Sequence, residues 1–217
     1  MSAPTLPPTA SLSLRTRLLR VGVSWPLIAL GIALLLDAHL GVAPFDVLTT
    51  GVVDVSGVSF GIIYAVVSLT FFAIGALLGG KVGFASVLGT FVIGPLIGVF
   101  RNVTPQPDSL VARGALVIAA TLILAVAVCL IITTELGSGP TEVFMLGLVN
   151  HNMPIVYARW ISDGLPLVVG VALGGTVGIG TVFFALALGP LIKYGLTALH
   201  YTPPHQPAAI ETVEITL

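Results

Sequence analysis

Long apolar segments separated by short polar ones make up most of the chain. Six of them come close to the roughly 20 residues that an α-helix needs to cross the hydrocarbon core of a bilayer. The first follows three arginines and ends at Leu36. We expect the others over residues 58–78, 84–100, 114–134, 155–173 and 179–199. The pattern predicts an all-α membrane protein with six transmembrane helices.

Composition indicates the same class of protein. Hydrophobic residues make up 56% of the chain and charged residues 8%. A soluble domain of this composition lacks the polar surface that keeps it dissolved, so the apolar excess must face lipid. Cys129, the single cysteine, lies in an apolar segment and is expected to serve packing. We therefore expect an integral membrane protein without a disulfide framework.

Two shorter segments begin at prolines and follow the first and fourth long segments. The segment from Pro44 to Val55 has about 12 residues, which at about 1.5 Å each cannot cross roughly 30 Å of hydrocarbon. A similar short helix is expected after Pro140, within the interval from Glu135 to Asn152. Each short helix must re-enter the membrane or lie at its interface.

The two short segments belong to an internal repeat. LGVAPFDVLTTG at Leu40–Gly51 matches LGSGPTEVFMLG at Leu136–Gly147 in its Leu, Gly, Pro, Val and closing Gly. A later block, LLGGKVGFASVLGTFVIGPLIG, has its counterpart in ALGGTVGIGTVFFALALGPLIK, with both Gly-Gly and both Gly-Pro steps. A period of this length indicates a duplicated helical bundle. We expect repeats at 15–100 and 114–199, a linker at 101–113, and disordered tails at 1–14 and 200–217.

The number of crossings predicts how the repeats are oriented. Three crossings per repeat is an odd number, so the second copy starts from the opposite side of the membrane and the repeat is inverted. The positive-inside rule agrees, because a cytoplasmic amino terminus leaves only Arg101 and Arg113 on the outer side. We expect both termini in the cytoplasm and the chain in a bacterial inner membrane. The basic residues then on the cytoplasmic side are Arg15, Arg17, Arg20, Lys81, Arg159 and Lys193.

These motifs resemble those of a known family. LGVAPFD at Leu40, LGSGPTE at Leu136, and GGTVGIGT with the later Gly-Pro step are similar to the YczE/YitT-like bacterial membrane proteins. The resemblance covers residues 15–199 and implies a multi-pass inner-membrane protein, in a group with no established activity. Such proteins often carry an arginine after the second proline, where this chain has Thr141, so an anion-binding role of that arginine does not carry over.

Asp46 and Glu142 are the first candidate site residues. They occupy matched positions in the first turns that follow Pro44 and Pro140. A carboxylate there complements the exposed amides and the positive end of the helix dipole, which is the structural interpretation. The functional interpretation is that the two carboxylates meet near the centre and bind a cation or carry protons.

Arg159 and Asp163 are four residues apart on the fifth long segment, so they share one helix face and can form an ion pair. Such a pair either neutralises an intramembrane charge or lines a polar cavity.

The Gly94-Pro95 and Gly189-Pro190 steps are expected to break the third and sixth long helices. The freed backbone carbonyls either accompany close helix packing or coordinate a substrate or ion.

Inverted repeats with interrupted helices are typical of secondary transporters, which favours transport of a small neutral or singly charged solute. The alternative is a non-transporting accessory or assembly protein with the same symmetry. No catalytic motif and no metal-ligand spacing occurs, so we expect no enzyme, no cofactor and no metal. The expected partners are the lipid bilayer and a solute or ion of unknown identity. A homo-oligomer or a partner membrane protein stays open, and nucleic acid is not expected.

Overall fold

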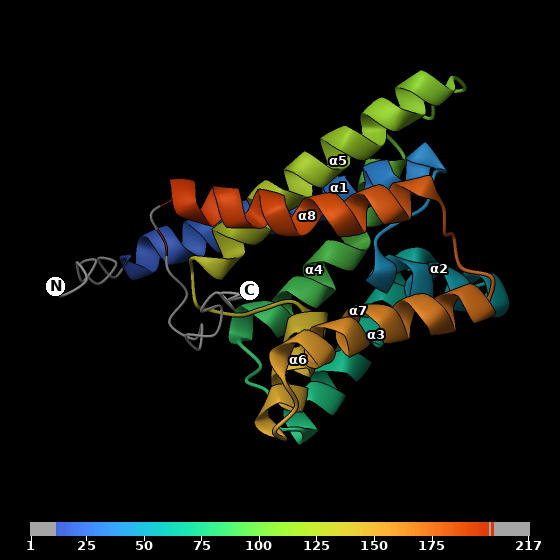
Figure 1. The fold of residues 1–217 in the computed structure, drawn as a ribbon. Helices are drawn as coiled ribbons and strands as arrows, with labels where there is room; N and C mark the ends of the chain where they lie inside the picture. The colour runs from blue at the N-terminus through green and yellow to red at the C-terminus, as the bar shows by residue number, and fades with distance from the viewer. Residues whose placement is uncertain (1–11, 200, 202–217) are drawn as a thin grey trace, which may run out of the picture.

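The computed structural model describes residues 12–199 and 201, and within them all regular secondary structure is α-helical (Figure 1). The predicted disordered tails lie almost entirely outside the described residues. The eight helices are α1 (Leu14–Ala38), α2 (Pro44–Ser56), α3 (Phe60–Leu77), α4 (Phe84–Arg101), α5 (Leu110–Ile132), α6 (Pro140–Asn150), α7 (Ile155–Ala172) and α8 (Ile179–Ala198).

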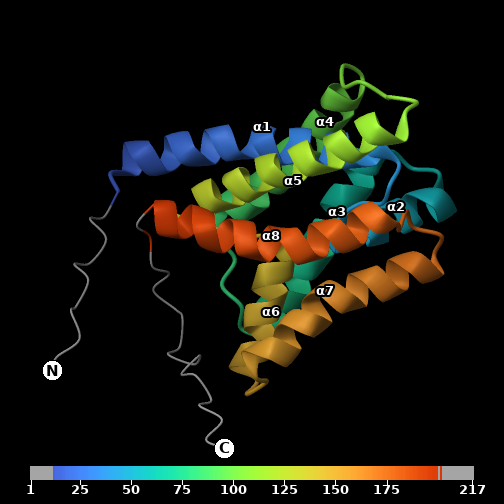
Figure 2. The same ribbon diagram turned by 45° about the horizontal axis from the view of Figure 1, so that its top comes forward.

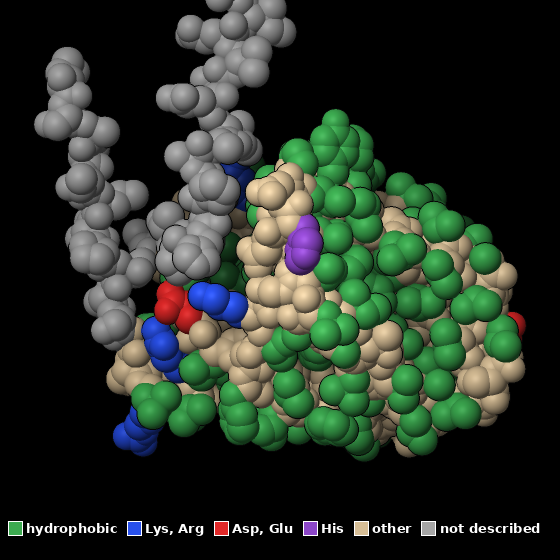
Figure 3. Space-filling model, turned by 90° about the horizontal axis from the view of Figure 1, so that it is seen from below, with side chains coloured by type: hydrophobic (Ala, Val, Ile, Leu, Met, Phe, Trp, Pro, Cys, Tyr) green, Lys and Arg blue, Asp and Glu red, His purple; other side chains and the backbone are tan. Residues whose placement is uncertain are grey.

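Six of these helices are long and apolar enough to cross a membrane, and they coincide with the six predicted segments. The chain is therefore a multi-pass membrane protein. The other two, α2 and α6, have 13 and 11 residues and begin at Pro44 and Pro140, where the missing backbone N–H costs the helix nothing. On the face in Figure 3 hydrophobic side chains predominate, and most charged side chains gather at one edge.

The helices form two groups (Figures 1 and 2). In one group α1 and α5 lie side by side, with α4 packed on α1 and α8 packed on α5. In the other, α2 packs on α7 and α6 packs on α3. Helix α4 also contacts α3 and so joins the two groups, whereas α8 and α7 barely touch.

Helices α1 and α5 run antiparallel and are fixed at both ends by arginines. Arg17, near the start of α1, pairs with Glu135 just after α5 at 3.1 Å. Arg113, near the start of α5, donates to the carbonyls of Ala38 and His39 at the end of α1, at 2.6 and 2.5 Å. Arg113 follows Arg17 by 96 residues, so matched positions of the repeat make matched contacts.

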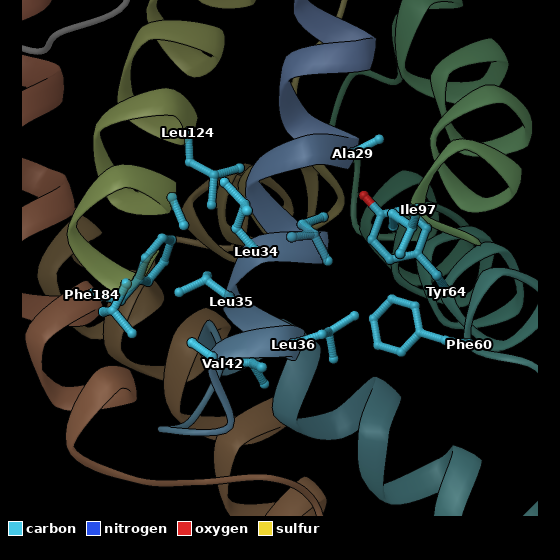
Figure 4. Packing of buried hydrophobic residues seen from close by; sticks show 14 of the residues in the cluster. Ala29, Leu34, Leu35, Leu36, Val42, Phe60, Tyr64, Ile97, Leu124 and Phe184 are labelled. Atoms are coloured by element: carbon cyan, nitrogen blue, oxygen red, sulfur yellow. The ribbon is translucent and has the colours of Figure 1, made fainter. Parts of the chain in front are cut away.

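The core is organised around the second half of α1, whose residues 31–38 are all buried. Leu35 is fully buried at its centre. Figure 4 shows Phe60 and Tyr64 of α3 on one side of α1, and Leu124 of α5 and Phe184 of α8 on the other. Side chains from α3, in one group, and from α5 and α8, in the other, therefore pack against the same turns of α1.

Each short helix crosses a long helix of the other repeat at a pair of glycines. A methyl group added to Gly51 of α2 would lie 2.7 Å from the carbonyl oxygen of Gly170 in α7. A methyl group added to Gly147 of α6 would lie 2.8 Å from the carbonyl oxygen of Gly75 in α3. Small residues let helix backbones approach closely in lipid, where dispersion replaces the hydrophobic effect as the force between helices.

The predicted breaks at the two Gly-Pro steps are wrong. Pro95 lies inside the continuous α4 and Pro190 inside the continuous α8. A proline removes one backbone hydrogen bond and crowds one carbonyl, but neighbouring helices and small local adjustments make this tolerable in membrane helices. The two prolines therefore do not divide their helices into half-helices.

The glycine crossings yield a test of the packing. In Gly170→Ala the new methyl group meets the Leu48 amide nitrogen at 2.4 Å and the Val47 carbonyl carbon at 2.5 Å, so α2 and α7 must separate. We expect a loss of about 1–3 kcal/mol of stability, measured by thermal unfolding in detergent. Gly164→Ala is the matched control, because it lies on the same helix with open space around it and gains helix propensity. Equal stability of the two variants would contradict the crossing.

Candidate functional site

Asp46 lies in the first turn of α2 and is almost completely buried, with 3% of its surface exposed. Neither short helix has a side-chain capping hydrogen bond, so Asp46 and Glu142 do not cap in that sense. The Oδ1 atom of Asp46 is buried without a hydrogen-bond partner among the described residues. Burial alone raises the pKa of the Asp46 carboxyl from 3.8 to about 7. Asp46 is therefore a buried carboxyl without an ion pair among the described residues.

Part of the surroundings of Asp46 comes from α3. Phe45, next to it, packs edge-on against Tyr64 at 5.9 Å between ring centroids. The carboxylate of Asp46 lies within electrostatic range of the Tyr64 hydroxyl. One turn further along α3, the Ser68 hydroxyl is buried beside the Tyr64 hydroxyl. Asp46, Tyr64 and Ser68 form what we call the buried half of the site.

The second repeat carries a charged counterpart, here called the charged half. Glu142 of α6 lies 3.7 Å from Nη1 of Arg159 on α7, and Nε of Arg159 lies 2.7 Å from Asp163. The ion pair predicted from the four-residue spacing is thus present, and Glu142 joins it. The three side chains are 35–45% exposed, in contrast to Asp46. The charged half therefore opens on the molecular surface.

The two halves adjoin. Phe71 of α3 packs edge-on against Phe45 of α2 and Phe144 of α6, both at 5.4 Å between ring centroids. Glu142 as well as Asp46 lies within electrostatic range of the Tyr64 hydroxyl. The structure therefore brings together four of the predicted residues: Asp46, Glu142, Arg159 and Asp163.

Tyr64 and Ser68 were not among the residues predicted from the sequence. A signal for them was available, because Arg159 and Asp163 follow them by 95 residues, which is the offset of the second half of the repeat. A tyrosine and a serine in an apolar helix attract little attention alone. Aligned with Arg159 and Asp163 of the second repeat, however, they become candidate site residues.

The predicted Gly-Pro residues lie elsewhere. Gly94 packs against Gly61 of α3, where an added methyl group would be 2.5 Å from the Gly61 carbonyl oxygen, and this supports its packing interpretation. Gly189 and Pro190 are exposed on α8, with open space around Gly189. Pro44 and Pro140 are the first residues of their helices. None of the four residues in the two Gly-Pro steps contributes to the acidic site.

Gly94 and Pro95 instead line a groove of about 1390 Å³ between α3 and α4. Asp46 and Glu142 do not line it. Thr50, however, does line it and lies one turn after Asp46 on the same side of α2. The groove thus reaches the helix that carries the buried carboxylate.

The side chains gathered here are carboxyls, hydroxyls and one guanidinium. Within residues 12–199 and 201, no three His, Cys, Asp or Glu side chains are gathered as a metal site. The charged half has one cation against two carboxylates and keeps a formal negative charge.

The buried carboxylate predicts a pH dependence of stability. Because the folded state holds a proton on Asp46 that the unfolded chain releases, stability falls as pH rises between about 4 and 7. In Asp46→Asn we expect this part of the decline to disappear when unfolding is followed in detergent across that range. Asp54→Asn is the control, since Asp54 is an exposed residue of the same helix. An unchanged decline in Asp46→Asn would show that the carboxyl is solvated.

Comparison with known proteins gives relatives without an assigned activity. An uncharacterised protein of Haemophilus influenzae is 25% identical over 178 residues, 82% of either chain. The uncharacterised membrane protein YczE of Bacillus subtilis is 22% identical over 196 residues, which is 85% of this chain and 89% of its own. No solved structure matches significantly.

The resemblance predicted from the LGVAPFD, LGSGPTE and GGTVGIGT motifs is confirmed by YczE and by a family model. The family of unknown function DUF6198 matches residues 15–196, from the start of α1 almost to the end of α8. The chain therefore belongs to this family of unknown function, and it is similar to YczE.

Proposed function

We propose that the protein is a secondary transporter of a small solute that is neutral or singly charged. The observation that carries the proposal is the buried carboxyl of Asp46, which has an unpartnered oxygen and lies near the hydroxyls of Tyr64 and Ser68 on α3. A buried ionisable group without a partner is costly, so an intramembrane site of this kind is a functional candidate by default. A proton or a small cation on Asp46 would offset that cost.

The proposal includes an inverted repeat. It is supported by the antiparallel α1 and α5 with their matched arginine contacts, and by the reciprocal packing of α2 on α7 and α6 on α3. In such an arrangement the two acidic short helices approach the centre from opposite leaflets as re-entrant elements. Exposure of the site would then alternate between one side and the other.

The proposed orientation has both termini in the cytoplasm of a bacterial inner membrane. Arg17, Arg20 and Glu135 lie at one end of the α1–α5 pair, and Arg101 and Arg113 at the other. The positive-inside rule assigns the first end to the cytoplasm, since it also carries more of the basic residues.

Charge limits the solute. The buried half has one ionisable carboxyl and two hydroxyls, and the charged half has a formal charge of one negative unit. A multiply charged solute would leave unpaired charge in a low-dielectric site, which is strongly unfavourable. Small polar or singly positive solutes are the class that fits.

The second candidate is a membrane accessory or assembly protein. One observation favours it, the weak contact between α7 and α8. The corresponding helices of the first repeat, α3 and α4, pack against each other. The apolar side chains along these two helices are largely exposed and would suit a partner protein in the membrane.

A flux assay separates the two functions. The purified chain in proteoliposomes is tested against a panel of small neutral and singly charged metabolites, with and without a pH gradient. We expect uptake of at least one compound, and its loss in Asp46→Asn and Glu142→Gln. Asp108→Asn, in the exposed linker, is the matched control and should retain uptake. If the folded wild-type protein transports nothing in the panel, the accessory function is the better account. Transport that survives both substitutions would remove the site from the mechanism.

A further inference from the structure

The groove between α3 and α4 has an apolar wall and one polar end. Its apolar part begins where Gly61 and Gly94 hold the two helices together. From there it extends along α3 to Leu69, on a surface that is open rather than enclosed. The apolar residues that line it include Ile62, Ala65, Val66, Leu69, Phe91 and Val99.

The polar end lies at the level of the lipid headgroups. Helix α3 begins at Phe60 and α4 ends at Arg101, so the two spans reach the same membrane surface there. Asp54, Arg101, Asn102 and Gln106 line the groove at this end. The ten helical residues from Phe60 to Leu69 rise about 15 Å, which is half of the roughly 30 Å hydrocarbon core. The groove is therefore one leaflet deep.

The polar end carries one group of each charge. Arg101 donates through Nε to the buried Asp37 at 3.2 Å, and its terminal nitrogens make no hydrogen bond within the described part of the chain. Asp54 is exposed and has no ion pair with the described residues. Asn102 and Gln106 add amide donors. A ligand that satisfies this end needs an anionic and a cationic group, joined to an apolar chain.

We propose that this groove binds a zwitterionic phospholipid with a primary ammonium headgroup, namely phosphatidylethanolamine. The phosphate meets the free nitrogens of Arg101, the ammonium donates to Asp54, and one acyl chain follows the apolar wall towards Leu69. An anionic headgroup such as phosphatidylglycerol offers Asp54 only hydroxyl donors and no cation, and its net negative charge is repelled by the carboxylate. The inference concerns a lipid site distinct from Asp46 and does not depend on transport.

The experiment is native mass spectrometry of the purified full chain in detergent. Equimolar phosphatidylethanolamine and phosphatidylglycerol with identical acyl chains are added, and the retained adducts are counted. We expect one tightly held phosphatidylethanolamine, in preference to phosphatidylglycerol. In Asp54→Asn the preference should fall about threefold, in line with the modest strength of an exposed ion pair.

Gly98→Phe tests the position of the acyl chain. Gly98 lines the groove on α4 and has open space around it, so an added ring fills the groove without displacing a neighbour. We expect about tenfold weaker retention of the lipid, equivalent to about 1.4 kcal/mol. Gly22→Phe is the matched control, because Gly22 is equally open but lies on α1 outside the groove.

The outcomes decide the proposal. Equal retention of the two headgroups by the wild-type protein would overturn the charge match. Retention in Gly98→Phe equal to that in Gly22→Phe would overturn the location. Loss of the adduct in Gly98→Phe alone, with a reduced preference in Asp54→Asn, supports both parts.

Discussion

The rest of the structure depends on two helix crossings at which backbone meets backbone. In a bilayer the hydrophobic effect does not press helices together, so association relies on close packing. Gly51 against Gly170 and Gly147 against Gly75 let the helix backbones approach closely. Each crossing joins a short helix of one repeat to a long helix of the other. Neither repeat can therefore complete its own fold, and the two acidic first turns are positioned only when both repeats are present.

The two glycine crossings have similar geometry, but the side chains beside their acidic residues differ. Asp46 and Glu142 occupy equivalent places, but the residues facing them differ, with Tyr64 in one half and Arg159 in the other. A neutral partner leaves Asp46 free to take up a proton. In the other half Arg159 lies 3.7 Å from Glu142, and both side chains are partly exposed. The duplicated frame thus offers two distinct electrostatic environments side by side, which a symmetric pair of acids would not.

The sequence was sufficient for the spans and insufficient for their contacts. Hydropathy and length located all six long helices, and the prolines located the starts of α2 and α6. Pro95 was misjudged because the rule that proline breaks helices comes from water, whereas membrane neighbours compensate for the lost hydrogen bond. Tyr64 was missed because its significance lies in alignment with Arg159, not in its residue type. Arg17 and Arg113 are 96 residues apart and make matched contacts. Comparing every polar residue with its counterpart at the repeat offset would have predicted contacts of this kind from the sequence.

The α3–α4 pair and the α7–α8 pair differ in how closely they pack. In the first repeat Gly61 and Gly94 let α3 and α4 touch. In the second repeat Gly189 is retained, but Val156 stands 95 residues after Gly61. A branched side chain at that place prevents the same backbone approach, and α7 and α8 barely touch. The Gly61–Gly94 contact that borders the groove between α3 and α4 therefore has no counterpart between α7 and α8. The lipid proposed for that groove has no equivalent place in the second repeat.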